Sequence, residues 1–159
     1  MKVILRVIVL FMLTASIISC DDNDTTTPVV LTPSYANFYG TWKLVSWNNK
    51  TVTDGLYCYI TFDRKEHTYK MYQKFDSMYA RYITGTYTIE KDKYNVYTVS
   101  GTYDYDNGDW NNVYIVTDLL ETGTMTWTAE DNKSDVCRYE RCDAVPSEII
   151  DEARIWDEE

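Results

Sequence analysis

The sequence predicts an all-β fold, an eight-stranded antiparallel up-and-down barrel followed by a short C-terminal helix. Three observations support this prediction. From residue 37 onward the chain is rich in Tyr, Thr, Val, Ile and Trp, which favour the pleated surface of a strand. Clusters of turn-forming residues recur at short intervals, with no helical pattern between them. Between the clusters apolar and polar residues alternate, as expected for strands with one buried face.

Seven turn clusters delimit the expected strands. The strands cover approximately residues 38–49, 56–62, 67–75, 79–90, 94–105, 110–120, 124–129 and 135–142. The links are short, so each strand is expected to pair with the next as a hairpin. Asn107–Gly108 gives the strongest turn signal, because both residues tolerate the positive φ of a type I′ turn. Closure of these strands leaves no exposed edge and encloses either a packed core or one small ligand.

The alternation assigns side chains to the two faces of the barrel. The inward residues that we expect to contact a ligand are Tyr69, Met71, Tyr79, Ile83, Tyr87, Met125 and Trp127, and Phe75 faces the same way. Four tyrosines are expected to face outward: Tyr57, Tyr59, Tyr72 and Tyr82. Residues 94–105 show no clean apolar face, so the alternation does not orient that strand.

The first residues are typical of a secretory signal peptide. Lys2 and Arg6 precede an apolar run over residues 7–18, and small residues follow it. Twelve helical residues cover roughly 18 Å, which is short of the ~30 Å hydrocarbon core of a membrane. The segment resembles a bacterial lipoprotein signal, in which the cysteine after the small residue is acylated. This resemblance implies that residues 1–19 are removed and that Cys20 carries the lipid.

The rest of the chain divides into three parts. Residues 20–36 are polar and contain two prolines, so we expect a flexible tether there. The barrel is expected over residues 37–145. Residues 146–159 are expected to form a helix and an acidic tail, with Ser147 as the N-cap and the apolar side of the helix packed on the outside of the sheet.

Charge and cysteine content restrict the partners. The net charge is −10, and removal of Lys2 and Arg6 with the leader makes it −12, which argues against nucleic acid and against direct adhesion to anionic lipid headgroups. In an oxidising compartment the remaining cysteines, Cys58, Cys137 and Cys142, allow one disulfide and leave one thiol. Three pairings are open. Cys137 and Cys142 would lie ~16 Å apart on a straight strand, so we favour a bridge that involves Cys58.

Several motifs resemble the lipocalin-like domains of Bacteroidetes lipoproteins. They are the Gly-x-Trp of Gly40–Trp42, then Ile60–Phe62, Gly85–Ile89 and Thr124–Thr128. The resemblance covers residues 37–142 and implies that Trp42 closes one end of the barrel beneath an arginine. Arg138 is taken as that arginine, with Arg141 as the alternative. The acidic residues that follow Cys20 resemble an export tag, which implies a lipid-anchored protein of the outer membrane that is exposed at the cell surface.

The residues indicate no catalytic, metal or cofactor site. Asp104, Asp106, Asn107 and Asp109 gather oxygen atoms, but the glycine spacing does not match a calcium loop, so we interpret them as a solvated hairpin tip. His67 has no nucleophile in a recognisable pattern and is expected at the barrel mouth or in solvent. We therefore expect a protein that is not an enzyme.

Two functions follow as hypotheses. The first is binding of a small apolar or amphipathic ligand inside the barrel, because tyrosine combines an apolar ring with a hydroxyl group. The alternative is a surface module with a filled barrel, whose outward tyrosines bind a protein or a glycan.

Overall fold

The computed structural model describes residues 27–75, 78–105 and 108–155, so the predictions for the leader, for Cys20 and for the acidic tail over residues 156–159 lie outside it. The elements are α1 (Tyr35–Phe38), β1 (Gly40–Trp47), β2 (Lys50–Thr51), β3 (Tyr57–Phe62), β4 (Thr68–Lys74), β5 (Arg81–Lys91), β6 (Tyr97–Gly101), β7 (Tyr114–Thr117), β8 (Thr124–Ala129), β9 (Val136–Cys142), α2 (Ser147–Glu152) and β10 (Arg154–Ile155).

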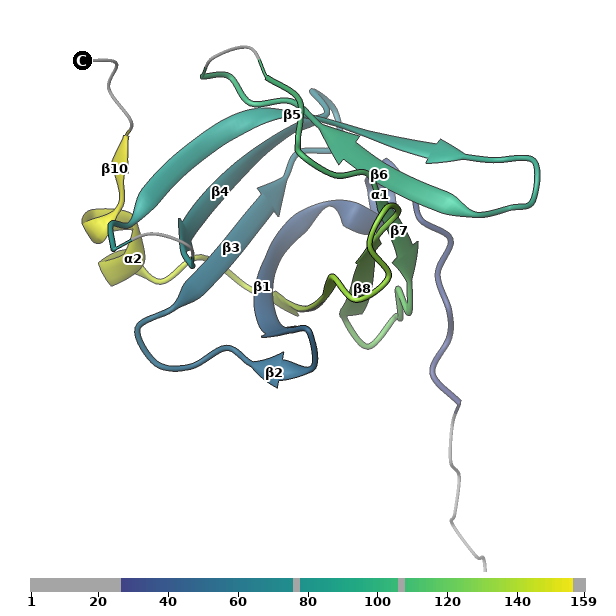
Figure 1. Ribbon diagram of the computed structural model, residues 1–159, viewed down its shortest axis with the longest axis horizontal. Helices are drawn as coiled ribbons and strands as arrows, with labels where there is room; N and C mark the ends of the chain where they lie inside the picture. The colour runs from purple at the N-terminus through teal and green to yellow at the C-terminus, as the bar shows by residue number, and fades with distance from the viewer. Residues whose placement is uncertain (1–26, 76–77, 106–107, 156–159) are drawn as a thin grey trace, which may run out of the picture.

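Eight of the strands form a closed antiparallel barrel, which confirms the predicted fold (Figure 1). Each of β1, β3, β4, β5, β6, β7, β8 and β9 pairs with the next, and β9 pairs with β1 to complete the ring. Two short strands lie outside this ring: β2 extends the end of β1 as a hairpin, and β10 runs parallel to the start of β5. Closure satisfies the backbone hydrogen bonds that an open sheet would expose at its edges.

The strands β6 and β7 are shorter than the sequence predicts. Thr102 forms an isolated bridge with Asp109, and the Tyr103 amide donates to the Gly108 carbonyl at 2.7 Å. Described residues on either side of residues 106–107 therefore pair with each other outside the ladder of the two strands, and Tyr103 and Trp110 line one end of the barrel. Asn107, on which the type I′ turn prediction depends, lies outside the described residues.

The C-terminal helix α2 packs on the outside of the barrel, as predicted. Ile149 and Ala153 contact the outward rings of Tyr57 and Tyr59, which are almost fully buried as a result. The N-cap prediction is wrong in detail: Pro146 occupies that position and no side chain caps the helix. Proline fits there because it has no amide hydrogen to satisfy.

Two side-chain contacts tie α2 to the barrel. Glu152 forms an ion pair with Lys74, and it accepts a hydrogen bond from the Tyr57 hydroxyl at 3.1 Å. After Glu152 the backbone becomes extended and leads directly into β10. The helix is therefore short and depends on the barrel for its position.

Aromatic rings fill one end of the barrel. Trp42, Phe38, Phe62 and Tyr87 are each 1 % exposed or less, and the ring of Phe38 lies 5.5 Å from that of Phe62 and 6.3 Å from that of Tyr87. The short helix α1, which the sequence did not predict, supplies Phe38. Ser34 caps this helix by accepting a hydrogen bond from the Asn37 amide.

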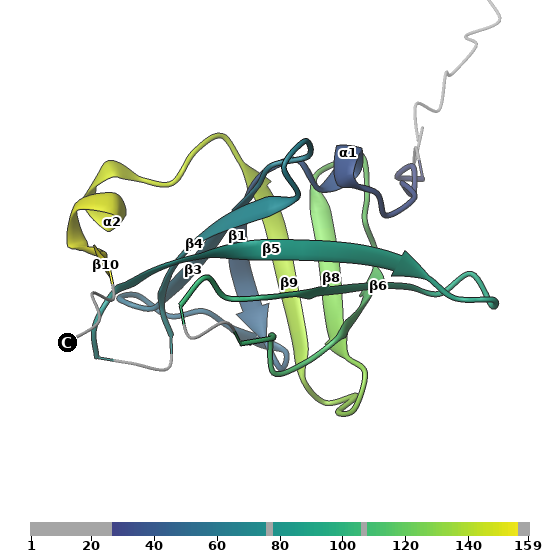
Figure 2. The same cartoon turned by 90° about the horizontal axis from the view of Figure 1, so that it is seen from above.

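The segment before α1 also lies at this closed end. The amide of Leu31 donates to the Leu119 carbonyl at 2.7 Å, and the amide of Glu121 donates to the Val29 carbonyl at 3.0 Å. Part of the segment expected as a tether is thus paired with the turn between β7 and β8. Figure 2 shows α1 on one side of the barrel and the turn between β8 and β9 on the opposite side.

Candidate functional site at the barrel mouth

The closed end is held by Gly40, Trp42 and Arg141, not by Arg138. The Arg141 guanidinium lies 4.3 Å from the centre of the Trp42 ring and donates to the backbone carbonyls of Tyr39 and of Asn37. Arg138 is exposed, because it lies an odd number of residues from Arg141 on β9 and points outward. The Trp42 indole donates to the Phe38 carbonyl at 2.8 Å. Trp42 and Phe38 are fully buried beneath Arg141, so these contacts close the barrel interior at this end.

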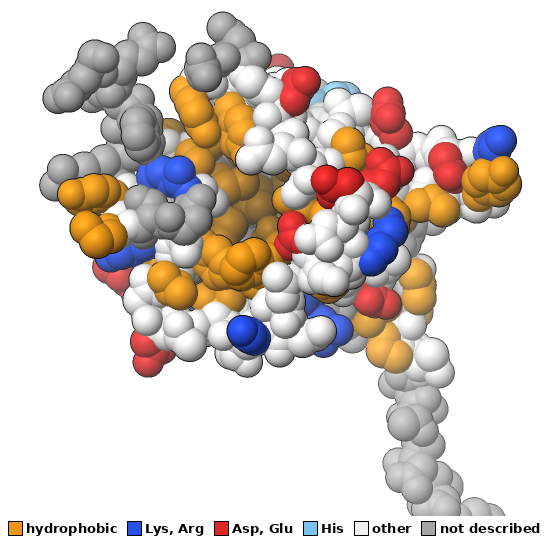
Figure 3. Space-filling model, viewed as in Figure 1, with side chains coloured by type: hydrophobic (Ala, Val, Ile, Leu, Met, Phe, Trp, Pro, Cys, Tyr) orange, Lys and Arg blue, Asp and Glu red, His pale blue; other side chains and the backbone are white. Residues whose placement is uncertain are grey.

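A cavity of about 360 Å³ occupies the opposite end of the barrel. In Figure 3 it appears as a hollow lined by hydrophobic side chains. Its walls come from β1, β3, β4, β9 and the chain around β7, and the residues that line it are Leu44, Trp47, Cys58, Met71, Gln73, Phe75, Tyr103, Trp110, Asn111, Asn112, Tyr114, Asp135, Cys137 and Tyr139. We call this space the mouth cavity.

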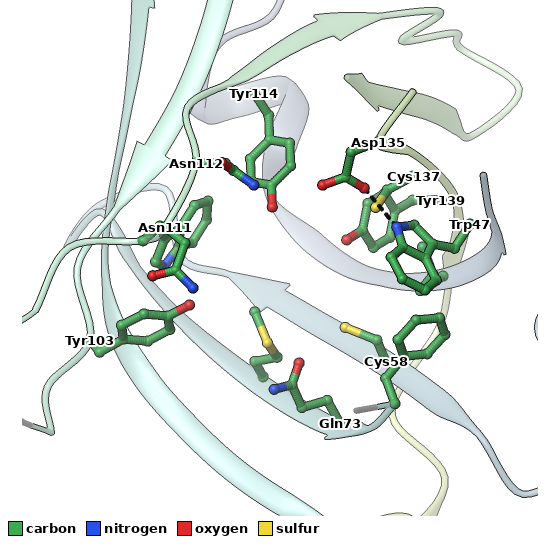
Figure 4. A pocket seen from close by; sticks show the side chains of 14 residues that line it. Trp47, Cys58, Gln73, Tyr103, Asn111, Asn112, Tyr114, Asp135, Cys137 and Tyr139 are labelled. Carbon is green, nitrogen blue, oxygen red and sulfur yellow. Dashed lines mark hydrogen bonds between the residues drawn. The ribbon is translucent and has the colours of Figure 1, made fainter. Parts of the chain in front are cut away.

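The mouth cavity combines an aromatic wall with a small number of polar groups, as Figure 4 shows. Trp47 and Phe75 meet edge to face at 5.1 Å, and the Trp47 indole donates to a carboxylate oxygen of Asp135 at 2.6 Å. Gln73 approaches from β4, and Asn111 approaches from the loop before β7. Such a lining suits a ligand that is mostly apolar but carries some polar atoms.

The tyrosine hydroxyls of the mouth cavity stay protonated at neutral pH. Burial raises the pKa of Tyr114 to about 12, and burial places the pKa of Tyr139 well above the ordinary tyrosine value. The negative form of each group loses more from desolvation than the neutral form does. Both side chains therefore keep a hydroxyl that is able to donate as well as accept.

Two of the cysteines line the mouth cavity, and no disulfide joins the three described cysteines. The expectation of a bridge from Cys58 is therefore wrong. Cys58 on β3 and Cys137 on β9 are separated by β1, so their backbones lie roughly 10 Å apart, beyond the reach of a disulfide. Cys142 points outward, toward the buried tyrosines beneath α2.

Most residues expected to contact a ligand lie in the packed core instead. Tyr69, Ile83, Tyr87, Met125 and Trp127 are each at most 3 % exposed, and they do not line the cavity. Met71 does line it, as does Phe75. Tyr79 was predicted to face inward and is 64 % exposed, because β5 begins only at Arg81 and Tyr79 belongs to the turn before it. The barrel is thus filled at its closed end and hollow at its mouth.

Trp47 and Asp135 were not identified from the sequence. Trp47 has the wrong parity to share a face with Trp42 and Leu44, but a register shift between Leu44 and Ser46 turns it inward. Asp135 follows a turn cluster and precedes β9, where an acidic residue usually indicates solvent. No local sequence pattern predicts that either residue lines the cavity, since the place of both depends on pairing between distant strands.

The other candidate residues lie away from the mouth cavity. His67 is exposed in the turn between β3 and β4 at the closed end, where its ring stacks on Tyr35 at 3.6 Å. Asp104 accepts a hydrogen bond from Thr84 at 2.6 Å. Within residues 27–75, 78–105 and 108–155, no cluster of His, Cys, Asp and Glu is arranged to bind a metal ion. None of the helices in these ranges is both long and apolar enough to cross a membrane.

Comparison with known proteins agrees with this architecture. The lipocalin-like domain family matches residues 38–134, which is more than half of the chain. Searches of curated proteins and of solved structures returned no match. The matched region begins at Phe38, which fills the closed end, and it ends two residues before β9 begins at Val136. The chain belongs to the lipocalin-like domain family, as this match, the closed barrel and its plugged end together show.

Proposed function

We propose that the protein binds a small, mostly apolar molecule with a few polar groups in the mouth cavity. The observation that carries this proposal is the cavity itself. Its volume of about 360 Å³ falls within the range of small-molecule sites, roughly 300–1,000 Å³. Its aromatic wall provides apolar contact, and Gln73, Asn111 and Asp135 provide polar atoms that would orient a ligand.

The experiment is to recover the ligand with the protein. Native mass spectrometry of the acyl-free protein, purified from its own host, should show a second mass that dissociates on activation. Gln73→Trp should abolish this mass because the larger side chain fills the cavity from β4. Lys70→Trp places the same ring on the exposed outer face of the same strand and should leave the mass unchanged. Equal occupancy in both variants would contradict binding in the mouth cavity.

We also propose that binding is not coupled to catalysis. Burial raises the pKa of the Cys137 thiol to about 12, so the thiol of this cavity residue is not a nucleophile at neutral pH. His67 lies at the other end of the barrel and is not placed to accept its proton. Turnover of an ester or a glycoside that a single substitution in the mouth cavity abolishes would contradict this part of the proposal.

A third proposal concerns location: a lipid anchor on Cys20 holds the protein at the outer membrane, with the domain exposed at the cell surface, as in Bacteroidetes lipoproteins. It is supported by Lys2 and Arg6 before an apolar run and by the acidic residues after Cys20. Cys20→Ala should release the protein from the membrane fraction. Replacement of Asp21, Asp22 and Asp24 by alanine should keep it in that fraction but protect it from protease added to whole cells.

The alternative function, a surface module that uses outward tyrosines, receives less support. Tyr57 and Tyr59 do face outward, but α2 covers them and they are 8 % and 6 % exposed. Tyr72 and Tyr82 are half-buried, and their rings contact each other at a tilt, with centres 4.8 Å apart. These side chains stabilise the barrel and its helix, and they do not form an open surface for a partner.

A further inference from the structure

We propose that the mouth cavity selects an organic cation, namely an ammonium group on a compact apolar body, over a carboxylate of the same shape. This inference rests on the proposed function and specifies the class of ligand. It depends on the charge of the cavity lining and on the position of the aromatic rings around that charge.

In the part of the chain that the structure describes, Asp135 is the one acidic residue among those that line the mouth cavity. None of the described residues that line the cavity is Lys, Arg or His. An ammonium group that enters would gain attraction from Asp135, whereas a carboxylate would lose hydration and meet repulsion. The net charge of −10 acts in the same direction on ligands that approach from solvent.

The carboxylate is held in place by the aromatic wall. The Trp47 indole donates to Asp135 at 2.6 Å, and the Trp47 ring in turn contacts Phe75. A cation beside Asp135 would therefore meet a carboxylate that Trp47 holds in position, with the apolar body of the ligand against the aromatic wall. The side-chain amides of Gln73 and Asn111 are neutral. Their oxygen atoms can accept hydrogen bonds from the remaining N–H groups of the ammonium without adding positive charge to the cavity.

Arg81 is the basic residue that bears most directly on this inference. It lies opposite Gln73 in the β4–β5 pairing, but it does not line the cavity. If a carboxylate ligand recruited Arg81, the order of affinities would reverse. The experiment therefore includes Arg81→Gln, which would weaken the carboxylate in that case and leave the amine unaffected.

The test compares three probes that share one body: phenylbutylamine, phenylbutanol and phenylbutyrate, titrated calorimetrically into the full chain at pH 7. We expect the amine to bind about tenfold tighter than the alcohol, and the carboxylate to bind more weakly than both. Asp135→Asn should reduce the preference for the amine over the alcohol to about twofold or less. The asparagine keeps an oxygen that accepts from Trp47, so the wall is preserved. Glu130→Gln removes the same charge from an exposed position of the same turn and should change nothing.

The outcomes separate this inference from the proposed function. Equal binding of the amine and the alcohol, tighter binding of the carboxylate, or no binding of the amine would each overturn it. So would a preference for the amine that Asp135→Asn does not reduce. In each of these cases a molecule that co-purifies in a Gln73-dependent manner would still support a ligand site in the mouth cavity.

Discussion

Gly40 adopts a backbone conformation that L side chains rarely occupy, with φ at +110°, and a Cβ atom there would lie 2.7 Å from the Arg141 guanidinium. Gly40→Ala should therefore lower the free energy of unfolding by about 2–4 kcal/mol, because it adds backbone strain to displacement of the arginine. Gly55 also has a positive φ but has open space around it, so Gly55→Ala should cost about 1 kcal/mol. Urea titrations measure both values, and equal losses would contradict the role of the contact with Arg141.

The assignment of Arg141 to the closed end gives a second comparison between matched residues. Arg141→Met should lower the free energy of unfolding by about 2–3 kcal/mol, since it removes charged hydrogen bonds to Tyr39 and Asn37 and the contact with Trp42. Arg138→Met alters an exposed side chain on the same strand and should change the free energy by less than about 0.5 kcal/mol. Thermal denaturation of the two variants is sufficient to distinguish them. A larger effect at Arg138 would restore the assignment made from the sequence.

At the scale of single residues, the sequence predicts which face of a strand a side chain occupies better than it predicts how deep in the barrel the side chain lies. The core rings Tyr69, Tyr87 and Trp127 face inward as alternation indicates, because the period of two is a local property of a strand. Their depth is not local: whether an inward ring fills the closed end or lines the mouth depends on the length of the strands around it. Trp47 adds a second reason, since one register shift reverses the parity on which the prediction depends.

At the scale of elements, the contact of α2 with the barrel should depend on pH. A hydrogen bond from Lys74, and a second from Tyr57, lower the pKa of the Glu152 carboxyl. A carboxyl group with a lowered pKa in the folded state stabilises that state above its ordinary pKa, and this contribution is lost as pH falls through the lowered value. Hydrogen-exchange protection of the α2 amides should therefore decrease as the pH falls below the ordinary pKa of a glutamate and through the lowered pKa of Glu152.

Two variants check the cause of this pH dependence. Glu152→Gln should make the protection of α2 low and nearly independent of pH, because the charge that binds Lys74 is gone. Tyr57→Phe keeps the ring beneath the helix and removes only the hydroxyl, so a part of the pH dependence should remain. An unchanged pH profile in Glu152→Gln would show that another group controls the helix.

The elements themselves were largely predictable, and the exceptions share a cause. Every barrel strand contains a segment that the composition and turns indicate. The helix α2 begins in the predicted segment but ends at Glu152, because Arg154–Ile155 pairs with β5 as β10. The elements that the sequence did not predict are α1, β2 and β10, each of which has four residues or fewer. Segments of this length have no periodicity to detect, and they form because the finished barrel offers partners for their backbones.

At the scale of the whole molecule, a filled end and a hollow end predict a gradient of local stability. Amides near Trp42, Phe62 and Tyr87 should exchange only through global unfolding, because buried rings pack on every side of them. Amides of the loops that surround the mouth cavity should exchange faster, through local openings. Hydrogen exchange followed by mass spectrometry measures this difference. A bound ligand should slow exchange at the mouth and leave the closed end unchanged, and uniform protection would contradict the gradient.

The position of residues 29–31 bears on the orientation of a lipid-anchored molecule relative to the membrane. These residues join the barrel at its plugged pole, through the turn that precedes β8. An acyl chain on Cys20 would attach the protein to the bilayer on the side of the plugged end. The opening of the barrel would then face away from the bilayer, toward the medium. Molecules that arrive from outside would then reach the cavity without crossing lipid.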